Sequence, residues 1–359
     1  MIKYLGSKRV LLPFILEVVE RLPGVRTVVD LFSGTSRVGH ALKAAGYRVL
    51  ANDHNAYAEV LARCYVEADR EEVAAEAAEL IRELNALPGR PGYFTETFCV
   101  RSRFVQPANG ARVDAIRAAI AARGLPPVLE AVLLVSLMEA ADRVDSTAGV
   151  QMAYLKRWAR RSYNPLELRL PRLLPRARHG KGRALGLDAL EAARRLQGDL
   201  VYLDPPYNQH SYLGNYHVWE TLVRWDAPEV YGVACKRVDV RERRSPFNSK
   251  RRAAAALREL LSALRARYLL VSFNDEGFLS RAELEEMLAA DGGARVVTLA
   301  RGHKRYVGAQ IGIHDPQGRK VGRVGRLRNT EYLFVVDRDP DREGARALDE
   351  LEAGVRAAG

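Results

Sequence analysis

The sequence is poor in the features that mark exported or membrane proteins. Its three cysteines, Cys64, Cys99 and Cys235, are scattered and have no Cys-x-x-Cys spacing. They argue against a disulfide framework and a zinc site, and they are typical of a reducing compartment. No segment approaches the roughly 18 apolar residues of a membrane span. The first residues, 1–9, contain no apolar signal core. We therefore expect a soluble, cytoplasmic protein.

A Gly-x-Gly-x-x-Gly turn is also missing, which argues against a dinucleotide site. The turn after the first predicted strand, 32–36, has a single glycine, Gly34, which still lets the backbone approach a ligand closely. Asp53 follows about 20 residues later, the spacing at which a carboxylate on the next strand reaches a ribose hydroxyl pair. A helix-capping aspartate would also fit this position. We favour the nucleoside ligand.

What the chain has in excess is positive charge. A hydrophobic content of 48% with 28% charged residues is ordinary for a globular protein, but a net charge of +12 with a pI of about 9.7 is not. This charge suggests a polyanionic partner, most simply nucleic acid. The 359 residues suffice for one large domain or two moderate ones.

Strand and helix patterns divide the chain into three parts. Residues 1–69 contain a strand-turn-helix-strand unit, in which we expect Thr35 or Ser36 to cap the helix. Residues 70–181 show helical periodicity without strand-helix alternation, and we interpret them as an inserted helical subdomain. Strands return in residues 182–359 and end in an antiparallel pair. The predicted strands are 27–31, 48–51, 183–187, 200–203, 268–273, 295–299 and 332–336.

The strand at 200–203 ends in Asp204-Pro205-Pro206-Tyr207. Two prolines cannot continue a central strand because each lacks the ladder N–H, so the backbone here must be stiff and turning. It holds one carboxylate and one aromatic ring at the carboxyl end of a strand, where ligands bind in open α/β sheets. Taken alone, the segment fits a stiff turn as well as an active site. An aromatic loop is predicted after it, with His210, Tyr212, Tyr216, His217 and Trp219.

Carboxylates follow four of the predicted strands. A metal site would need them to converge on one point, whereas each of these lies on a separate strand. Spread along a sheet edge, they would contact separated parts of one extended ligand, and we predict no metal. A cationic cofactor such as S-adenosylmethionine fits this row, which consists of Asp30, Asp53, Asp188 and Asp204.

These motifs resemble those of the adenine-specific DNA methyltransferases of the Dam-like (alpha) group, in the same order along the chain. The departure is a Phe-Ser-Gly-Thr turn where many members have a second glycine. The matching segments are Lys3-Tyr-Leu-Gly-Ser-Lys8, Phe32-Ser-Gly-Thr35, Asn52-Asp53, Asp204-Pro-Pro-Tyr207, Val271-Ser-Phe-Asn-Asp275 and Arg305-Tyr-Val-Gly-Ala309.

The resemblance implies a Rossmann-like α/β methyltransferase fold with a mixed, mostly parallel sheet and a C-terminal antiparallel strand pair. Residues 1–69 and 182–359 would form the catalytic domain, and 70–181 the helical target-recognition subdomain. The implied reaction moves a methyl group from S-adenosylmethionine to the N6 amino group of a flipped-out adenine in double-stranded DNA. The enzyme would serve a restriction-modification system beside a cognate endonuclease, or act as an orphan methylase.

The resemblance also assigns roles to residues. Asp204 and the carbonyl of Pro205 would each accept one amino hydrogen of adenine, Pro206 would stiffen the turn, and Tyr207 would stack on the base. Positioning would dominate the rate gain, and Asp204 would need no raised pKa. Cofactor contacts are expected from Tyr4, Lys8, Asp30, Phe32, Ser33, Gly34, Thr35, Asp53, His54 and Asp188.

Basic clusters beside aromatic residues predict the contacts with DNA phosphates. Three readings stay open: the DNA adenine enzyme, a methyltransferase for RNA adenine or DNA cytosine N4, and a DNA-binding protein that has lost catalysis. Neither the recognition sequence nor the oligomeric state can be read from the sequence. The expected phosphate contacts are Arg157, Arg160, Arg161, Arg243, Arg244, Lys250, Lys304 and Arg305.

Overall fold

The centre of the protein is a seven-stranded sheet with the strand order β3-β2-β1-β4-β7-β9-β8. The computed structural model describes residues 1–6, 8–290, 293–304 and 328–358. Strands β3, β2, β1, β4 and β7 run parallel, β9 is antiparallel to β7, and β8 is antiparallel to β9. The predicted mixed sheet with a C-terminal antiparallel pair is thus confirmed. Its strands are β1 Thr27–Asp30, β2 Arg48–Asn52, β3 Arg183–Leu185, β4 Leu200–Leu203, β7 Tyr268–Asn274, β8 Arg295–Lys304 and β9 Arg328–Asp337.

Helices cover both faces of this sheet because successive strand residues point to opposite sides. Val28, Tyr202 and Leu270 pack on one face with α1, α2 and α14, whereas Val29 and Val201 pack on the other with α8, α11 and α12. The covering helices are α1 Leu12–Arg21, α2 Arg37–Ala44, α8 Ala189–Arg195, α11 Ala253–Ala263, α12 Arg281–Ala289 and α14 Arg342–Ala358.

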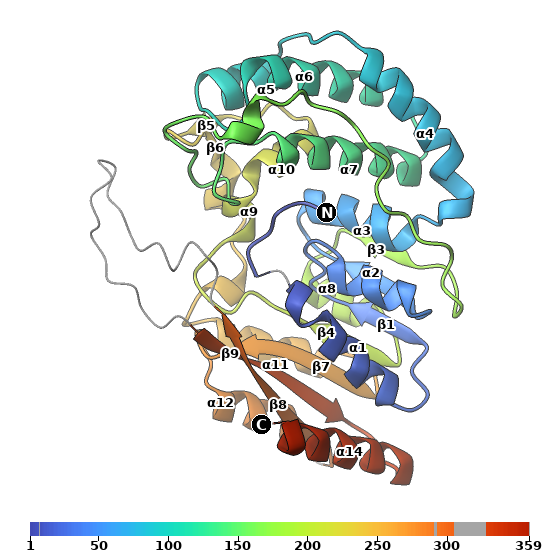
Figure 1. Cartoon of the computed structure of the whole chain (residues 1–359). Helices are drawn as coiled ribbons and strands as arrows, with labels where there is room; N and C mark the ends of the chain where they lie inside the picture. The colour runs from blue at the N-terminus through green and yellow to red at the C-terminus, as the bar shows by residue number, and fades with distance from the viewer. Residues whose placement is uncertain (7, 291–292, 305–327, 359) are drawn as a thin grey trace.

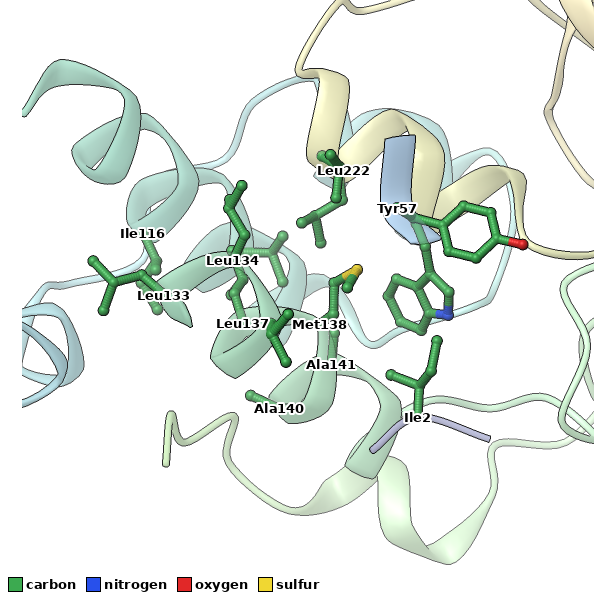
Figure 2. Close-up of a cluster of buried hydrophobic side chains, with 14 of the residues drawn as sticks. Ile2, Tyr57, Ile116, Leu133, Leu134, Leu137, Met138, Ala140, Ala141 and Leu222 are labelled. Carbon is green, nitrogen blue, oxygen red and sulfur yellow. The ribbon is translucent and has the colours of Figure 1, made fainter. Parts of the chain in front are cut away.

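A second, helical layer lies above the sheet at the top of Figure 1. Figure 2 shows its core, where side chains from the N-terminal segment, α3, α6, α7 and α10 converge, among them Ile2, Tyr57, Ile116, Leu134 and Leu222. Helix α10 follows β4 in sequence yet packs in this layer. The helices concerned are α3 Ala56–Ala62, α4 Arg70–Ala86, α5 Tyr93–Thr95, α6 Pro107–Ala122, α7 Pro127–Arg143 and α10 His217–Arg224, with π-helical turns at Arg63–Glu67 and Glu96–Val100.

Two local predictions are wrong. The segment after Asn208 is helical and not a loop: Ser211 accepts a hydrogen bond from Gly214 N at 3.1 Å to cap α9 Tyr212–Asn215, and α10 then buries its aromatic residues against the helical layer. Ser36 precedes α2 in a left-handed conformation with φ 57°, so its side chain makes no capping hydrogen bond.

Short 3₁₀ turns lie at Lys8–Val10 and Arg160–Tyr163, and the other short elements lie in 228–252. Strands β5 Val230–Tyr231 and β6 Lys236–Arg237 pair with each other outside the main sheet. Two 3₁₀ turns follow at Val238–Arg241 and Pro246–Asn248. The basic loop predicted from the sequence therefore has a defined path, which brings residues 242–248 back to the edge of the main sheet.

Candidate active site

The carboxyl ends of β1, β2, β3 and β4 open into one cavity of about 320 Å³. All ten residues predicted to hold a cofactor line it, together with Asp204 and Pro206 of the predicted catalytic turn. Parallel pairing explains this, because neighbouring parallel strands end at one edge of the sheet. Side chains as far apart in the sequence as Asp30 and Asp204 therefore share one pocket.

Asp204 follows the last residue of β4 and lies against Lys8. The distance from Lys8 Nζ to Asp204 Oδ1 is 3.1 Å, and the same ammonium lies 3.3 Å from Glu331 Oε2 of β9. Burial raises the pKa of Asp204 to about 6, and the Lys8 charge opposes this rise. The motif alone does not predict a raised pKa, because the burial of Asp204 arises only in the folded protein.

Tyr207 fixes the far end of the same turn. Its backbone oxygen accepts a hydrogen bond of 2.9 Å from Phe278 N, and its ring lies 5.5 Å from that of Phe273 at the end of β7. The Lys8 ammonium lies 5.8 Å from the ring centroid, within the range of a cation–π contact. The turn is thus anchored to the neighbouring strand as well as stiffened by its prolines.

Asp53 joins two of the turns that form the pocket floor. Its Oδ2 accepts a hydrogen bond of 3.1 Å from Gly34 N, and its Oδ1 accepts one of 3.0 Å from Asn55 N. Gly34 has φ +50°, a conformation that side chains disfavour, and a Cβ here would lie 3.5 Å from the ring of Tyr4. Asp53 therefore orders the glycine turn and faces the pocket at the same time. It does not cap a helix, because the N-cap residue of α3 is Asn55 and no side chain makes a capping hydrogen bond there.

Asp30 is the most unusual group in the pocket. It is 1% exposed, and within the described part of the chain neither carboxylate oxygen makes a well-aligned hydrogen bond, although the backbone N–H of Gly39 interacts with this group and lowers its pKa slightly. Burial, followed by repulsion from Asp204, raises the pKa of Asp30 to about 8. Ser33 Oγ and Asn55 Oδ1 line the same cavity and are buried without a partner among the described residues. An unsatisfied buried carboxylate next to other free acceptors is suited to a cationic ligand that carries hydrogen-bond donors.

Asp188 and the N-terminal loop complete this side of the pocket. Asp188 caps α8 by accepting a hydrogen bond of 2.9 Å from Leu190 N, and its exposed side chain remains at the rim. The Tyr4 ring stacks on Tyr212 and Tyr216 with centroid distances of 5.2 and 4.5 Å. This stack holds the loop that carries Lys8 over the strand ends.

Another wall of the cavity is formed by a segment in which Arg243 and Arg244 were predicted to contact DNA phosphates. Residues 242–248, here called the strap, line the cavity. Arg243 Nη1 donates a hydrogen bond of 2.9 Å to the fully buried Glu220, and the Phe247 ring meets Phe32 edge to face at 5.4 Å. Asn248 Nδ2 donates to the backbone oxygen of Asn208 at 2.8 Å, which ties the strap to the loop after the predicted catalytic turn. Within this basic segment, Pro246 and Phe247 were the residues that could have indicated a packed cavity wall and not a solvated DNA-binding loop.

The other predicted DNA contacts are distributed differently. Arg157, Arg160 and Lys250 are exposed, and Arg244 is exposed at the rim of the cavity. Arg161 Nη2 pairs with Asp145 at 2.7 Å, and its side chain is about a third exposed. The side chain of Lys304 and the whole of Arg305 lie outside the described residues.

The sequence of this chain matches the family model of the D12 class N6 adenine-specific DNA methyltransferases over residues 4–287. The chain belongs to this family. This D12-class chain is 29% identical to the modification methylase StsI of Streptococcus sanguinis, over 94% of its own length and 52% of StsI. It is 32% identical to the type II methyltransferase M.FokI of Planomicrobium okeanokoites, over 81% of its length and 47% of that relative.

A third relative is comparable to the chain in length. The type II methyltransferase M.NlaIII of Neisseria lactamica is 30% identical over 79% of this chain and 86% of its own length. The D12-class chain thus spans only about half the length of StsI and M.FokI. Among the described residues, no helix is long and apolar enough to cross a membrane, and no group of three or more His, Cys, Asp or Glu side chains could hold a metal ion.

Proposed function

We propose that this D12-class chain transfers a methyl group from S-adenosylmethionine to the N6 amino group of a flipped-out adenine in double-stranded DNA. The observation that carries the proposal is the junction of Asp204 with a pocket of unpaired buried acceptors at one sheet edge. Its relatives named as type II methyltransferases support a role in restriction-modification.

The pocket residues fit the cofactor. S-adenosylmethionine supplies a methyl group on a sulfonium, which is an excellent leaving group. Asp30, whose carboxylate makes no well-aligned hydrogen bond with the described residues, would face a cationic part of this molecule. Asp53 would accept hydrogen bonds from the ribose hydroxyls of the cofactor. Asp188 at the rim would reach the adenine amino group. Tyr4, Phe32 and the glycine turn would line the space between them.

The chain itself positions the amino group. Asp204 and the Pro205 carbonyl are acceptors at the end of one rigid turn, and each would take one amino hydrogen. Holding both hydrogens draws the nitrogen toward tetrahedral geometry and frees its lone pair for attack. The anchored ring of Tyr207 would stack on the flipped base. Asp204 also has a pKa of about 6, so it is ionised at neutral pH and remains basic enough to take up the proton that leaves the nitrogen.

The helical layer would bind the DNA. Arg157 and Arg160 are exposed near Trp158, whose ring lies 4.7 Å from the Arg103 guanidinium. Tyr163 is 69% exposed in the same segment. Exposed cations beside aromatic rings are typical of nucleic-acid surfaces. We propose that residues 70–181 form the target-recognition subdomain, flanked by the two parts of the catalytic domain.

Transfer of a labelled methyl group would test this function. The purified chain is incubated with methyl-labelled S-adenosylmethionine and double-stranded DNA, and the DNA is digested to nucleosides and separated. We expect the label in N6-methyl-2′-deoxyadenosine from the DNA. Label in N4-methylcytosine, or in RNA offered in parallel, would replace the substrate assignment. DNA binding without any transfer would favour the reading as a binding protein.

A further inference from the structure

Glu331 is a buried carboxylate that lies beside the catalytic turn and has no assigned role. It lies on β9, beyond residue 287 where the family match ends, and it is 8% exposed. In the sheet it pairs with Asn274 of β7, the strand next to the one that carries Asp204. The antiparallel pair therefore contributes a charge beside Asp204, whereas Asp30, Asp53 and Asp204 themselves lie at the ends of parallel strands.

Lys8 connects this carboxylate to the catalytic one. Its ammonium lies 3.1 Å from Asp204 Oδ1 and 3.3 Å from Glu331 Oε2, and its side chain is only 7% exposed. Burial opposes the charge on Lys8, but Asp204 and Glu331 together raise the pKa of Lys8 well above its ordinary value. Lys8 is therefore a fixed cation between two carboxylates.

The position of Lys8 affects how strongly Asp204 can accept a hydrogen bond from the substrate amino group. If Lys8 were paired with Asp204 alone, its ammonium would direct its hydrogen bonds and positive charge to that carboxylate. Asp204 would then be a weaker acceptor for an amino hydrogen. A second carboxylate shares the ammonium and reduces this loss. Lys8 contacts Oδ1, so the other oxygen of Asp204 remains available for the substrate.

We propose that Glu331 is a positioning residue of the active site: it shares the Lys8 ammonium with Asp204 and thereby keeps Asp204 a strong acceptor directed into the pocket. The proposal rests on the function proposed above. It adds a residue from the C-terminal strand pair to the machinery of methyl transfer.

Other groups near Asp204 must be considered when its titration is measured. Asp30 on β1 is repelled by Asp204 and has a pKa of about 8. Tyr202 on β4 and Tyr212 on α9 have pKa values raised well above 10 by burial, and burial raises that of Tyr207 to about 12. The tyrosines therefore stay neutral below pH 8, and Asp204 titrates before Asp30.

The test is a carboxyl ¹³C NMR titration of the ligand-free protein, with the Asp204 signal identified by its loss in Asp204→Asn. In the unsubstituted protein we expect a midpoint near pH 6. Glu331→Gln should lower this midpoint, because Lys8 then pairs with Asp204 alone, and Lys8→Met should raise it by about one pH unit or more. Glu286→Gln, which removes an exposed carboxylate on α12, is the matched control and should leave it unchanged.

A second measurement follows transfer itself. At pH 8, Glu331→Gln should slow single-turnover transfer up to about tenfold while cofactor affinity stays unchanged, because only the acceptor is weakened. If the titration midpoint of Asp204 stays unchanged or rises in Glu331→Gln, the proposal is overturned, whatever the activity of the variant. An inactive unsubstituted protein would refute the proposed function and leave the titration to decide on Glu331. Urea unfolding of each variant identifies any loss that comes from the fold.

Discussion

The pocket has two walls that are built in different ways. One wall consists of the strand ends, where the parallel sheet places Asp30, Asp53 and Asp204 along one edge by backbone pairing alone. The other is the strap, residues 242–248. Side-chain contacts hold it in place: Arg243 binds the buried Glu220, and Asn248 binds the loop after the Asp204–Tyr207 turn. The first wall presents reactive groups, and the second closes the space around them. Substitutions in the two walls should therefore fail in different ways.

The largest effect should come from the strand-end wall. Asp204→Asn keeps the shape of the side chain but replaces the accepting carboxylate with an amide, so methyl transfer should fall by about 10²- to 10⁴-fold. Cofactor affinity should change little, since the pocket stays intact. Single-turnover rates and calorimetric titration of the same preparation measure the two quantities. An Asp204→Asn variant with near-normal rates would remove Asp204 from the mechanism.

Cofactor affinity should depend on pH through Asp30 in the same wall. Its pKa is about 8 without ligand, and a cation bound beside it favours the ionised form. Binding at pH 7 should therefore release a proton, and affinity should rise with pH up to about 8, by at most about tenfold per pH unit. Calorimetry in buffers of different ionisation enthalpy counts the protons. Release that persists unchanged in Asp30→Asn would assign it to another group.

Arg243→Gln tests the strap wall. The substitution removes a charged hydrogen bond to the buried Glu220. Glu220 still has a second cationic partner, because Arg224 Nε lies 3.4 Å from it. We expect a loss of about 2 kcal/mol in the free energy of unfolding and a severalfold weaker cofactor affinity. The salt dependence of DNA binding should not change. Arg251→Gln, an exposed neighbour, serves as the control in urea unfolding and calorimetry. If the salt dependence of DNA binding changed in Arg243→Gln and not in Arg251→Gln, Arg243 would be a DNA contact after all.

The smallest effect on the pocket should come from Arg157 and Arg160, which the sequence could not distinguish from Arg243. Replacing both with alanine should lower the slope of log affinity against log salt by about two in magnitude, because two phosphate contacts are lost. Cofactor affinity should stay constant. Fluorescence anisotropy with labelled duplex over a salt series measures the slope, with Arg342→Ala on α14 as a matched surface control. An unchanged slope would show that Arg157 and Arg160 do not contact the DNA phosphates.

The two walls also differ in how far the sequence predicts them. The strand-end wall could be predicted because a short apolar run followed by Asp204 or Asp53 fixes both the strand and the edge at which it ends. The strap could not, because Arg243 is structural only through Glu220, and nothing in the sequence shows that Glu220 is buried. Helix α10 was missed for the same reason: its aromatic residues pack on a helical layer formed by distant segments.

The same limit applies to the charges around Asp204. The sequence indicates Lys8 and Asp204 as functional residues but gives them separate roles, one toward the cofactor and one toward the substrate. Their contact, and that of Lys8 with Glu331, depends on a strand order that places β9 beside β7. A pKa raised by burial is likewise a property of the assembled pocket and not of the motif.

Sequencing of modified bases in cellular DNA is the most direct test of the central claim. Bacteria that lack adenine methylation are made to express the chain or its Asp204→Asn variant, and their genomic DNA is read for methylated bases. We predict N6-methyladenine at one recurring sequence with the unsubstituted chain and none with the variant. Unmodified adenine throughout the genome, or the same methylation with Asp204→Asn, would contradict the account.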